Sequence, residues 1–146
     1  MHHVTLTVTD LERTFEWYHS VLGFGEVVRY RNDTIAADCL VLAFPGAARP
    51  TLGFREYDSP EPGPFDERCI GLDHLALDVG HEESLRAWHL HFERLGVPFA
   101  ETRLPELSIT VIRDPDNIQI ELCAWNPSPV GSSIDEHGRL QVPTEG

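Results

Sequence analysis

The chain of 146 residues is short of basic residues and has no long apolar run. Eleven Lys and Arg face 24 Asp and Glu, and the resulting charge of −13 argues against a nucleic-acid partner, because phosphate backbones bind positive surfaces. No stretch approaches the roughly 18–20 apolar residues of a membrane span, and the alternating residues 4–8 are not typical of a signal peptide. We therefore expect neither a nucleic-acid nor a membrane partner.

Cysteine is also scarce. Cys39, Cys69 and Cys123 are odd in number and form no CxxC pair. Such spacing is not typical of a disulfide framework or of a thiolate zinc site. We expect free thiols and a cytoplasmic location, where thiols stay reduced.

The chain does contain one sequence pattern that occurs twice. His3-Val-Thr-Leu-Thr-Val opens an alternating, strand-like stretch, and the helical stretch that follows ends at Val21-Leu-Gly-Phe24. About half a chain later, His74-Leu-Ala-Leu-Asp-Val opens a second such stretch, and its helical stretch ends at Arg94-Leu-Gly-Val97. Two related half-domains, each opening a strand with a histidine, can bring both imidazoles to one site if a pseudo-twofold axis relates them.

Periodicity and turn signals predict the same order of elements, βαβββ, in each half. In the first half, a helix over 11–22 is expected between Asp10 as its N-cap and Gly23 as its stop. The strands of this half are predicted over residues 4–8, 26–31, 39–44 and 51–57. The second half is predicted to have a helix over 82–95 and strands over 74–79, 99–102, 108–113 and 118–124.

These elements predict an α+β fold. We divide the chain into a first module over residues 1–58, a linker over 59–70, a second module over 71–125 and a polar tail over 126–146. The tail is expected to be an extended arm or disordered. Two tandem βαβββ modules would form a curved, incompletely closed mixed β-barrel with helices outside and a ligand cleft inside.

Glu121 is the carboxylate that could join the two histidines. Strand parity places Glu121 on one face of its strand and Ile120 and Leu122 on the other, which would pack under the helix. Two imidazoles and one carboxylate make a metal site with open positions for water or substrate. The alternatives are two structural strand-start histidines, His3 and His74, and an exposed strand glutamate.

The residues now point to a family. The chain resembles the vicinal oxygen chelate superfamily, which includes glyoxalase I, bleomycin resistance proteins, fosfomycin-resistance thiol transferases, methylmalonyl-CoA epimerase and extradiol dioxygenases. The resemblance covers about residues 2–125. The stretches that carry it are His2-His-Val-Thr-Leu-Thr-Val-Thr-Asp-Leu11, Trp17-Tyr-His-Ser-Val-Leu-Gly-Phe24, Gly71-Leu-Asp-His-Leu-Ala-Leu-Asp-Val79 and Arg113-Asp-Pro-Asp-Asn-Ile-Gln-Ile-Glu-Leu122.

The resemblance implies metal ligands on the first and last strands of the modules, which here are His3, His74 and Glu121. Laying Leu52-Gly-Phe-Arg55 on Ile118-Gln-Ile-Glu121 places the fourth, pseudo-symmetric position at Arg55. An arginine cannot ligate a metal because its guanidinium stays protonated.

Arg55 and Tyr57 are the further candidates for the site. Arg55 would bind a substrate carboxylate or another anion if it points into the cleft, and otherwise it is a solvent-facing strand residue. Tyr57 shares strand parity with Arg55 and is a candidate proton donor, so Tyr57 joins Glu121 as a candidate catalytic residue.

We expect a metal-dependent enzyme of the glyoxalase or dioxygenase type, acting as a lyase, isomerase or ring-cleaving oxygenase. A divalent ion (Fe2+, Mn2+, Ni2+ or Zn2+) would act as a Lewis acid on a small oxygen-chelating substrate. One alternative is a non-enzymatic protein that sequesters a cationic small molecule, as bleomycin resistance proteins do, which the acidic charge favours. Another is a degenerate module that serves only dimerisation.

The resemblance also implies a homodimer. If the two halves do not meet within one chain, His3 and His74 would belong to different sites of a swapped dimer. The sequence leaves the two arrangements open.

Overall fold

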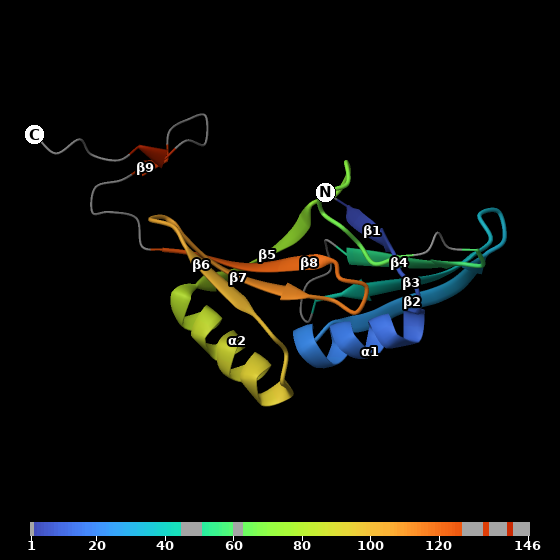
Figure 1. Ribbon diagram of the computed structural model, residues 1–146, viewed down its shortest axis with the longest axis horizontal. Coiled ribbons are helices and arrows are strands. Elements are labelled where there is room, and N and C mark those ends of the chain that lie inside the picture. Colours follow the sequence, from blue (N-terminus) through green and yellow to red (C-terminus); the bar gives the residue numbers. More distant parts are fainter. Residues whose placement is uncertain (1, 45–50, 60–62, 127–132, 135–139, 142–146) are drawn as a thin grey trace, which may run out of the picture.

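The computed structural model describes residues 2–44, 51–59, 63–126, 133–134 and 140–141 (Figure 1). The first module comprises β1 (His3–Thr7), α1 (Leu11–Leu22), β2 (Gly25–Asn32), β3 (Ala37–Ala43) and β4 (Thr51–Tyr57). The second module comprises β5 (His74–His81), α2 (Glu82–Leu95), β6 (Ala100–Arg103), β7 (Leu107–Arg113) and β8 (Gln119–Trp125). In the C-terminal segment, β9 (Ser133–Ile134) pairs antiparallel with β10 (Leu140–Gln141). Apart from Asn126, the rest of the predicted tail lies outside the described residues.

Each module forms its own four-stranded mixed sheet. The first sheet has the order β1-β4-β3-β2 and the second has the order β5-β8-β7-β6. In both, the opening strand runs parallel to the last strand of its module, and the other neighbours are antiparallel. The predicted α+β fold of two βαβββ modules is confirmed, although the two sheets do not close into a barrel. The exact boundaries of modules, linker and tail stay predictions.

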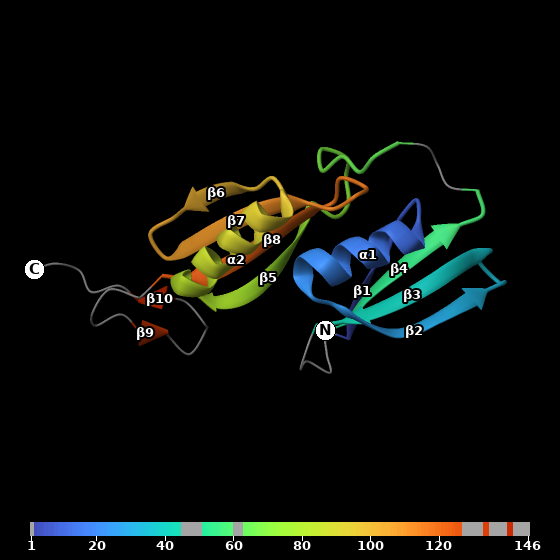
Figure 2. The ribbon, with the colours of Figure 1, turned by 90° about the horizontal axis from the view of Figure 1, so that it is seen from below.

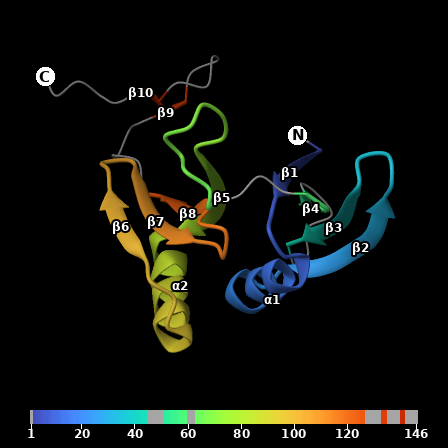
Figure 3. The same cartoon turned by 45° about the vertical axis from the view of Figure 1, so that its right-hand side comes forward.

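The modules lie side by side, with α1 and α2 on the same side of the molecule (Figures 1 and 2). Figure 3 shows that each helix lies against its own sheet. No helix in the described part of the chain is long and apolar enough to cross a membrane. The three cysteines are free thiols, as expected.

Both helices span the predicted residues, because local signals determine their ends. Asp10 caps α1 by accepting a hydrogen bond from the Arg13 backbone N–H at 2.9 Å. Gly23 follows α1 with φ 75°, and Gly96 follows α2 with φ 69°, the left-handed conformation that stops a helix and suits glycine.

Each helix buries one face of its sheet. On β8, Ile120 and Leu122 are buried, whereas Gln119, Glu121 and Cys123 on the other face are only partly so. This confirms the prediction that Ile120 and Leu122 lie on the buried face of the strand and Glu121 on the opposite face. The same alternation holds in the first sheet, where Leu6, Leu40, Leu42, Leu52 and Phe54 are buried. Each sheet thus keeps one face that its own helix does not cover.

The turn between β7 and β8 joins the second module to α1 of the first. The Tyr18 hydroxyl donates to Asp114 Oδ2 at 3.1 Å, and burial raises the pKa of both groups. Asp116 accepts from the backbone N–H of Thr9 at 3.0 Å and from Arg13 Nη2 at 2.8 Å. These contacts connect residues about a hundred positions apart, so they hold the two modules in one orientation.

We expect Tyr18→Phe to lower the free energy of unfolding by about 1–3 kcal/mol, because the buried Asp114 carboxylate loses its hydroxyl donor. Urea denaturation measures the change. Tyr30→Phe is the matched control: Tyr30 is 46% exposed, and we expect a change within about 0.5 kcal/mol. Equal stability of both variants would contradict the role of this hydrogen bond.

Candidate functional site

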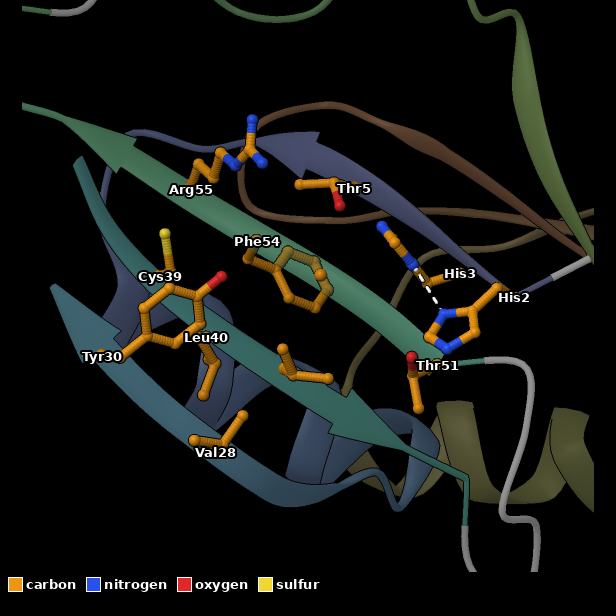
Figure 4. A pocket seen from close by; sticks show the side chains of 12 residues that line it. His2, His3, Thr5, Val28, Tyr30, Cys39, Leu40, Thr51, Phe54 and Arg55 are labelled. Carbon is orange, nitrogen blue, oxygen red and sulfur yellow. Dashed lines mark hydrogen bonds between the residues drawn. The ribbon is translucent and has the colours of Figure 1, made fainter. Parts of the chain in front are cut away.

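A cavity of about 300 Å³ lies on the uncovered face of the first sheet (Figure 4). The predicted site residues His3 and Arg55 both line it, together with Thr5 and Gly53 from the same two strands and Tyr30 from β2. Among the described residues that line this cavity there is no Asp or Glu. Its charged and titratable side chains therefore favour an anionic ligand.

His3 contacts the residue that precedes it. The Nδ1 atoms of His2 and His3 are 2.8 Å apart, and their rings meet edge to face with centroids 5.1 Å apart (Figure 4). Because Nδ1 of His3 is occupied in this way, Nε2 is its remaining nitrogen for a ligand.

Arg55 is paired with the other predicted residue of its strand. A hydrogen bond to the Tyr57 hydroxyl oxygen raises the pKa of the Arg55 guanidinium. Tyr57 itself lines a separate groove with Thr9 and Phe65 and is absent from the described lining of the His3 cavity. It lies six residues along β4 from the register partner of His3, a separation of about 20 Å. The geometry therefore connects Tyr57 to Arg55 rather than to His3.

In the second module, the two predicted ligands lie together on the uncovered face. His74 Nε2 is 3.4 Å from Glu121 Oε2, and His74 Nδ1 is 2.7 Å from Asp73 Oδ1. A carboxylate only accepts, so Nδ1–H of His74 donates to Asp73, and Nε2 is the ring nitrogen that faces Glu121. Two atoms bound to one ion at about 2.0–2.2 Å lie about 2.8–3.6 Å apart. The 3.4 Å separation of Nε2 and Oε2 therefore fits a divalent cation that takes the place of any Nε2 proton.

Further polar groups hold Glu121 in place. Gln119 Nε2 donates to Glu121 Oε1 at 3.1 Å, and Arg113 Nη2 donates to Gln119 Oε1 at 2.9 Å. Arg113 also binds both carboxylate oxygens of Glu67, whose pKa it lowers to about 2. This chain leaves Glu121 Oε2 directed at His74.

None of these supporting residues was predicted from the sequence. One feature of the sequence could have indicated Gln119: it lies two residues before Glu121, which places both side chains on the same face of the strand. The pairing of Arg113 with Gln119 follows from the register of β7 and β8, which the sequence does not state.

The three predicted metal ligands do not meet within one chain. His74 and Glu121 are neighbours on the second sheet, whereas His3 lies in the cavity of the first sheet. Over the residues with described positions, no three His, Cys, Asp or Glu side chains form a group that could hold a metal ion. A complete three-ligand site inside a single chain is therefore not what the fold builds.

The strand register corrects the fourth pseudo-symmetric position. Thr5 pairs with Gly53 in the first sheet, and its counterpart Ala76 pairs with Glu121 in the second. Gly53 is therefore the counterpart of Glu121, and the placement at Arg55 was wrong by two residues. A shift of two residues keeps every side chain on the same face of a strand, so the alternating pattern could not reveal the error.

The backbone at Gly53 leaves no room for a metal-ligating side chain at this position. A Cβ on Gly53 would lie 2.7 Å from Thr5 Oγ1, closer than such atoms approach. The first sheet thus offers no carboxylate opposite His3. Arg55 stands on the same face, two residues further along β4.

Comparison with known proteins agrees with the fold and the repeated pattern. A model of the Glyoxalase/Bleomycin resistance protein/Dioxygenase superfamily matches residues 1–122. The chain belongs to this superfamily. No relative is found among curated proteins.

Solved structures of the superfamily have the same architecture. A glyoxylase/bleomycin resistance protein/dioxygenase domain from Frankia sp. EAN1pec is 32% identical, with a TM-score of 0.78 and coverage of 88% of this chain and 93% of that one. The fosfomycin resistance protein FosX from Listeria monocytogenes, complexed with Mn(II) and sulfate, is 21% identical, with a TM-score of 0.61 and coverage of 87% and 93%. A lactoylglutathione lyase from Agrobacterium tumefaciens is 20% identical, with a TM-score of 0.64 and coverage of 85% and 92%. The last two share the fold with this chain.

We expect Gly53→Ala to destabilise the protein by about 1–3 kcal/mol, because the new methyl group must displace Thr5. Adding Thr5→Ala should recover much of this loss, and urea denaturation of the two single variants and the double variant measures the coupling. Gly25→Ala is the control, since a Cβ there meets nothing within 4 Å. Independent, additive effects would contradict the close contact.

Proposed function

We propose that the protein is a divalent-metal-dependent enzyme of the glyoxalase or dioxygenase type, with His3 of one chain and His74 and Glu121 of a second chain as ligands. The observation that carries this proposal is the pair of candidate ligand atoms, His74 Nε2 and Glu121 Oε2, that face one another at 3.4 Å. Their supporting contacts, Asp73 on His74 and Gln119 on Glu121, are of the kind that orients metal ligands.

The division of the ligands supports a homodimer. Each uncovered sheet face holds only part of the donor set, so a second copy is needed to complete it. Apolar side chains are also exposed on these faces: Val28 (45%) and Tyr30 (46%) line the first cavity, and Trp125 (61%) lies at the end of β8. Apolar surface of this kind favours burial against a partner.

The donor set fits several ions. Imidazole and carboxylate ligands accept Fe2+, Mn2+, Ni2+ or Zn2+, and the Mn(II) bound by FosX supports Mn2+ among them. A bound ion would supply Lewis-acid polarisation of a substrate oxygen. Burial raises the pKa of the neighbouring Cys123 thiol, and the nearby Glu121 carboxylate raises it further.

The cavity favours an anionic, oxygen-bearing substrate. Arg55 presents a planar fork of donors of the kind that binds carboxylates and similar anions, and one of its hydrogen bonds goes to Tyr57. The acidic charge of the whole chain suggested sequestration of a cation, but the described cavity lining contains no acid to bind one. The substrate would determine whether the enzyme acts as a lyase, an isomerase or an oxygenase.

We expect His3→Ala and Glu121→Ala each to lose most bound metal, measured by elemental analysis of untagged protein. After subunit exchange, a mixture of the two should regain about one quarter of the sites, because each heterodimer holds one intact ligand set and one doubly defective set. The doubly substituted protein, treated in the same way, is the control and should regain none.

Two results would contradict this proposal in different ways. Unchanged stoichiometry in both single variants would remove the metal site. Loss in both variants without recovery in the mixture would assign all three ligands to one chain.

We expect Arg55→Gln to weaken binding of oxalate, a dianion with neighbouring oxygens, to the metal-loaded protein by about 10-fold, since one charged hydrogen-bonding pair is lost. Isothermal titration calorimetry measures the dissociation constant. Arg29→Gln is the control, because Arg29 already pairs with Glu12 at 2.7 Å. Equal oxalate affinity in the wild-type protein and the Arg55 variant would exclude Arg55 from ligand binding.

A further inference from the structure

The residue immediately before each predicted histidine ligand contacts Nδ1 of that histidine. Asp73 Oδ1 lies 2.7 Å from His74 Nδ1, and His2 Nδ1 lies 2.8 Å from His3 Nδ1. The two pairs occupy equivalent places in the internal repeat, at the start of β5 and of β1. The contact is therefore repeated although its chemistry differs, a carboxylate in one module and an imidazole in the other.

We propose that His2 and Asp73 are positioning residues that keep the proton of His3 and His74 on Nδ1, so that Nε2 of each ring is presented to the cation. The inference rests on the proposed function for the identity of the bound group. The placement of the protons does not depend on metal, so it can be tested separately.

In the second module the chemistry of the contact determines the tautomer. The Asp73 carboxylate can only accept, so His74 donates through Nδ1–H, and Nε2 is the nitrogen left to bind a cation. The same Nε2 is the atom that faces Glu121 at 3.4 Å. A carboxylate that binds the second nitrogen of a metal-ligating histidine fixes the ring and increases its basicity.

In the first module an imidazole takes the place of that carboxylate. Between two facing nitrogens, one must donate and the other accept. If His2 accepts, His3 carries its proton on Nδ1 and Nε2 is open to the cavity (Figure 4). If His2 donated instead, a neutral His3 would carry its proton on Nε2 and could not ligate through it. The equivalence with Asp73 assigns His2 the accepting role.

The difference between the two partners has a consequence. An ionised acceptor makes a stronger hydrogen bond than a neutral one. His74 is therefore held more firmly in the Nδ1–H form than His3, and the first module supplies the more weakly fixed ligand. Replacing His2 by aspartate would give both modules the same contact.

The tautomers can be read directly by long-range nitrogen–proton NMR of isotope-labelled, metal-free protein at a pH where the spectra show the rings to be neutral. Signals of His3 and His74 are assigned from His3→Gln and His74→Gln. Both rings should show the Nδ1–H form in the wild-type protein. His2→Ala should shift only His3 towards the Nε2–H form, and Asp73→Ala should shift only His74.

Rescue separates positioning from a general loss of structure. His2→Asp should restore the Nδ1–H form of His3, whereas His81→Ala, the control at the exposed end of β5, should leave both rings unchanged. His2→Ala should also weaken metal binding by about 10- to 100-fold in competition with a chelating dye, and His2→Asp should recover it.

The outcomes distinguish this inference from the proposed function. An Nε2–H form of His3 in the wild-type protein, or a tautomer that His2→Ala leaves unchanged, would overturn the inference. So would wild-type metal affinity in His2→Ala. If the tautomers respond as expected but the wild-type protein binds no metal, the positioning role stands and the proposed function fails.

Discussion

Each sheet is covered by one helix, and each therefore buries only one of its two faces. Because side chains alternate along a strand, this constraint sends Ile120 and Leu122 into the core and leaves Glu121 on the opposite face. The same alternation exposes His3 and Arg55 on the first sheet. The candidate chemistry lies on these faces because they are the part of each module that its own helix does not bury.

The two modules share a backbone plan but carry different halves of the site. The histidines His3 and His74 are equivalent, whereas Gly53 stands where the other module has Glu121. One face therefore offers a carboxylate and an imidazole to a cation, and the other offers an imidazole and the guanidinium of Arg55. The repeated fold thus places the candidate cation ligands His74 and Glu121 on one sheet and the candidate anion-binding residue Arg55 on the other.

The contacts between the two modules fix the orientation of the two uncovered faces relative to each other. The β7–β8 turn packs on α1 through the Tyr18–Asp114 hydrogen bond and the Arg13–Asp116 ion pair. Because both contacts are made on the helix side of the molecule, they leave the uncovered faces accessible. The candidate site residues and the contacts between the modules therefore lie on opposite sides of the sheets.

The sequence alone determined the helices over 11–22 and 82–95, the order of the strands and the facing of Glu121. These features depend on local signals: helix caps, glycines that end the helices, and the alternation of apolar and polar residues along a strand. Each signal is contained within a few residues of the sequence. It also singled out His74 and Glu121, which the fold brings together because β5 and β8 are paired neighbours.

Tertiary structure decided the rest. The pseudo-symmetric place of Gly53 required the register of β1 and β4, because a slip of two residues leaves the facing of every side chain unchanged. The separation of His3 from His74 required the packing of one module on the other, which depends on contacts between residues far apart in the chain, such as Thr9 with Asp116. A pseudo-twofold axis could bring the two histidines together either within one chain or between two chains. Only the packing of the modules could distinguish these two arrangements.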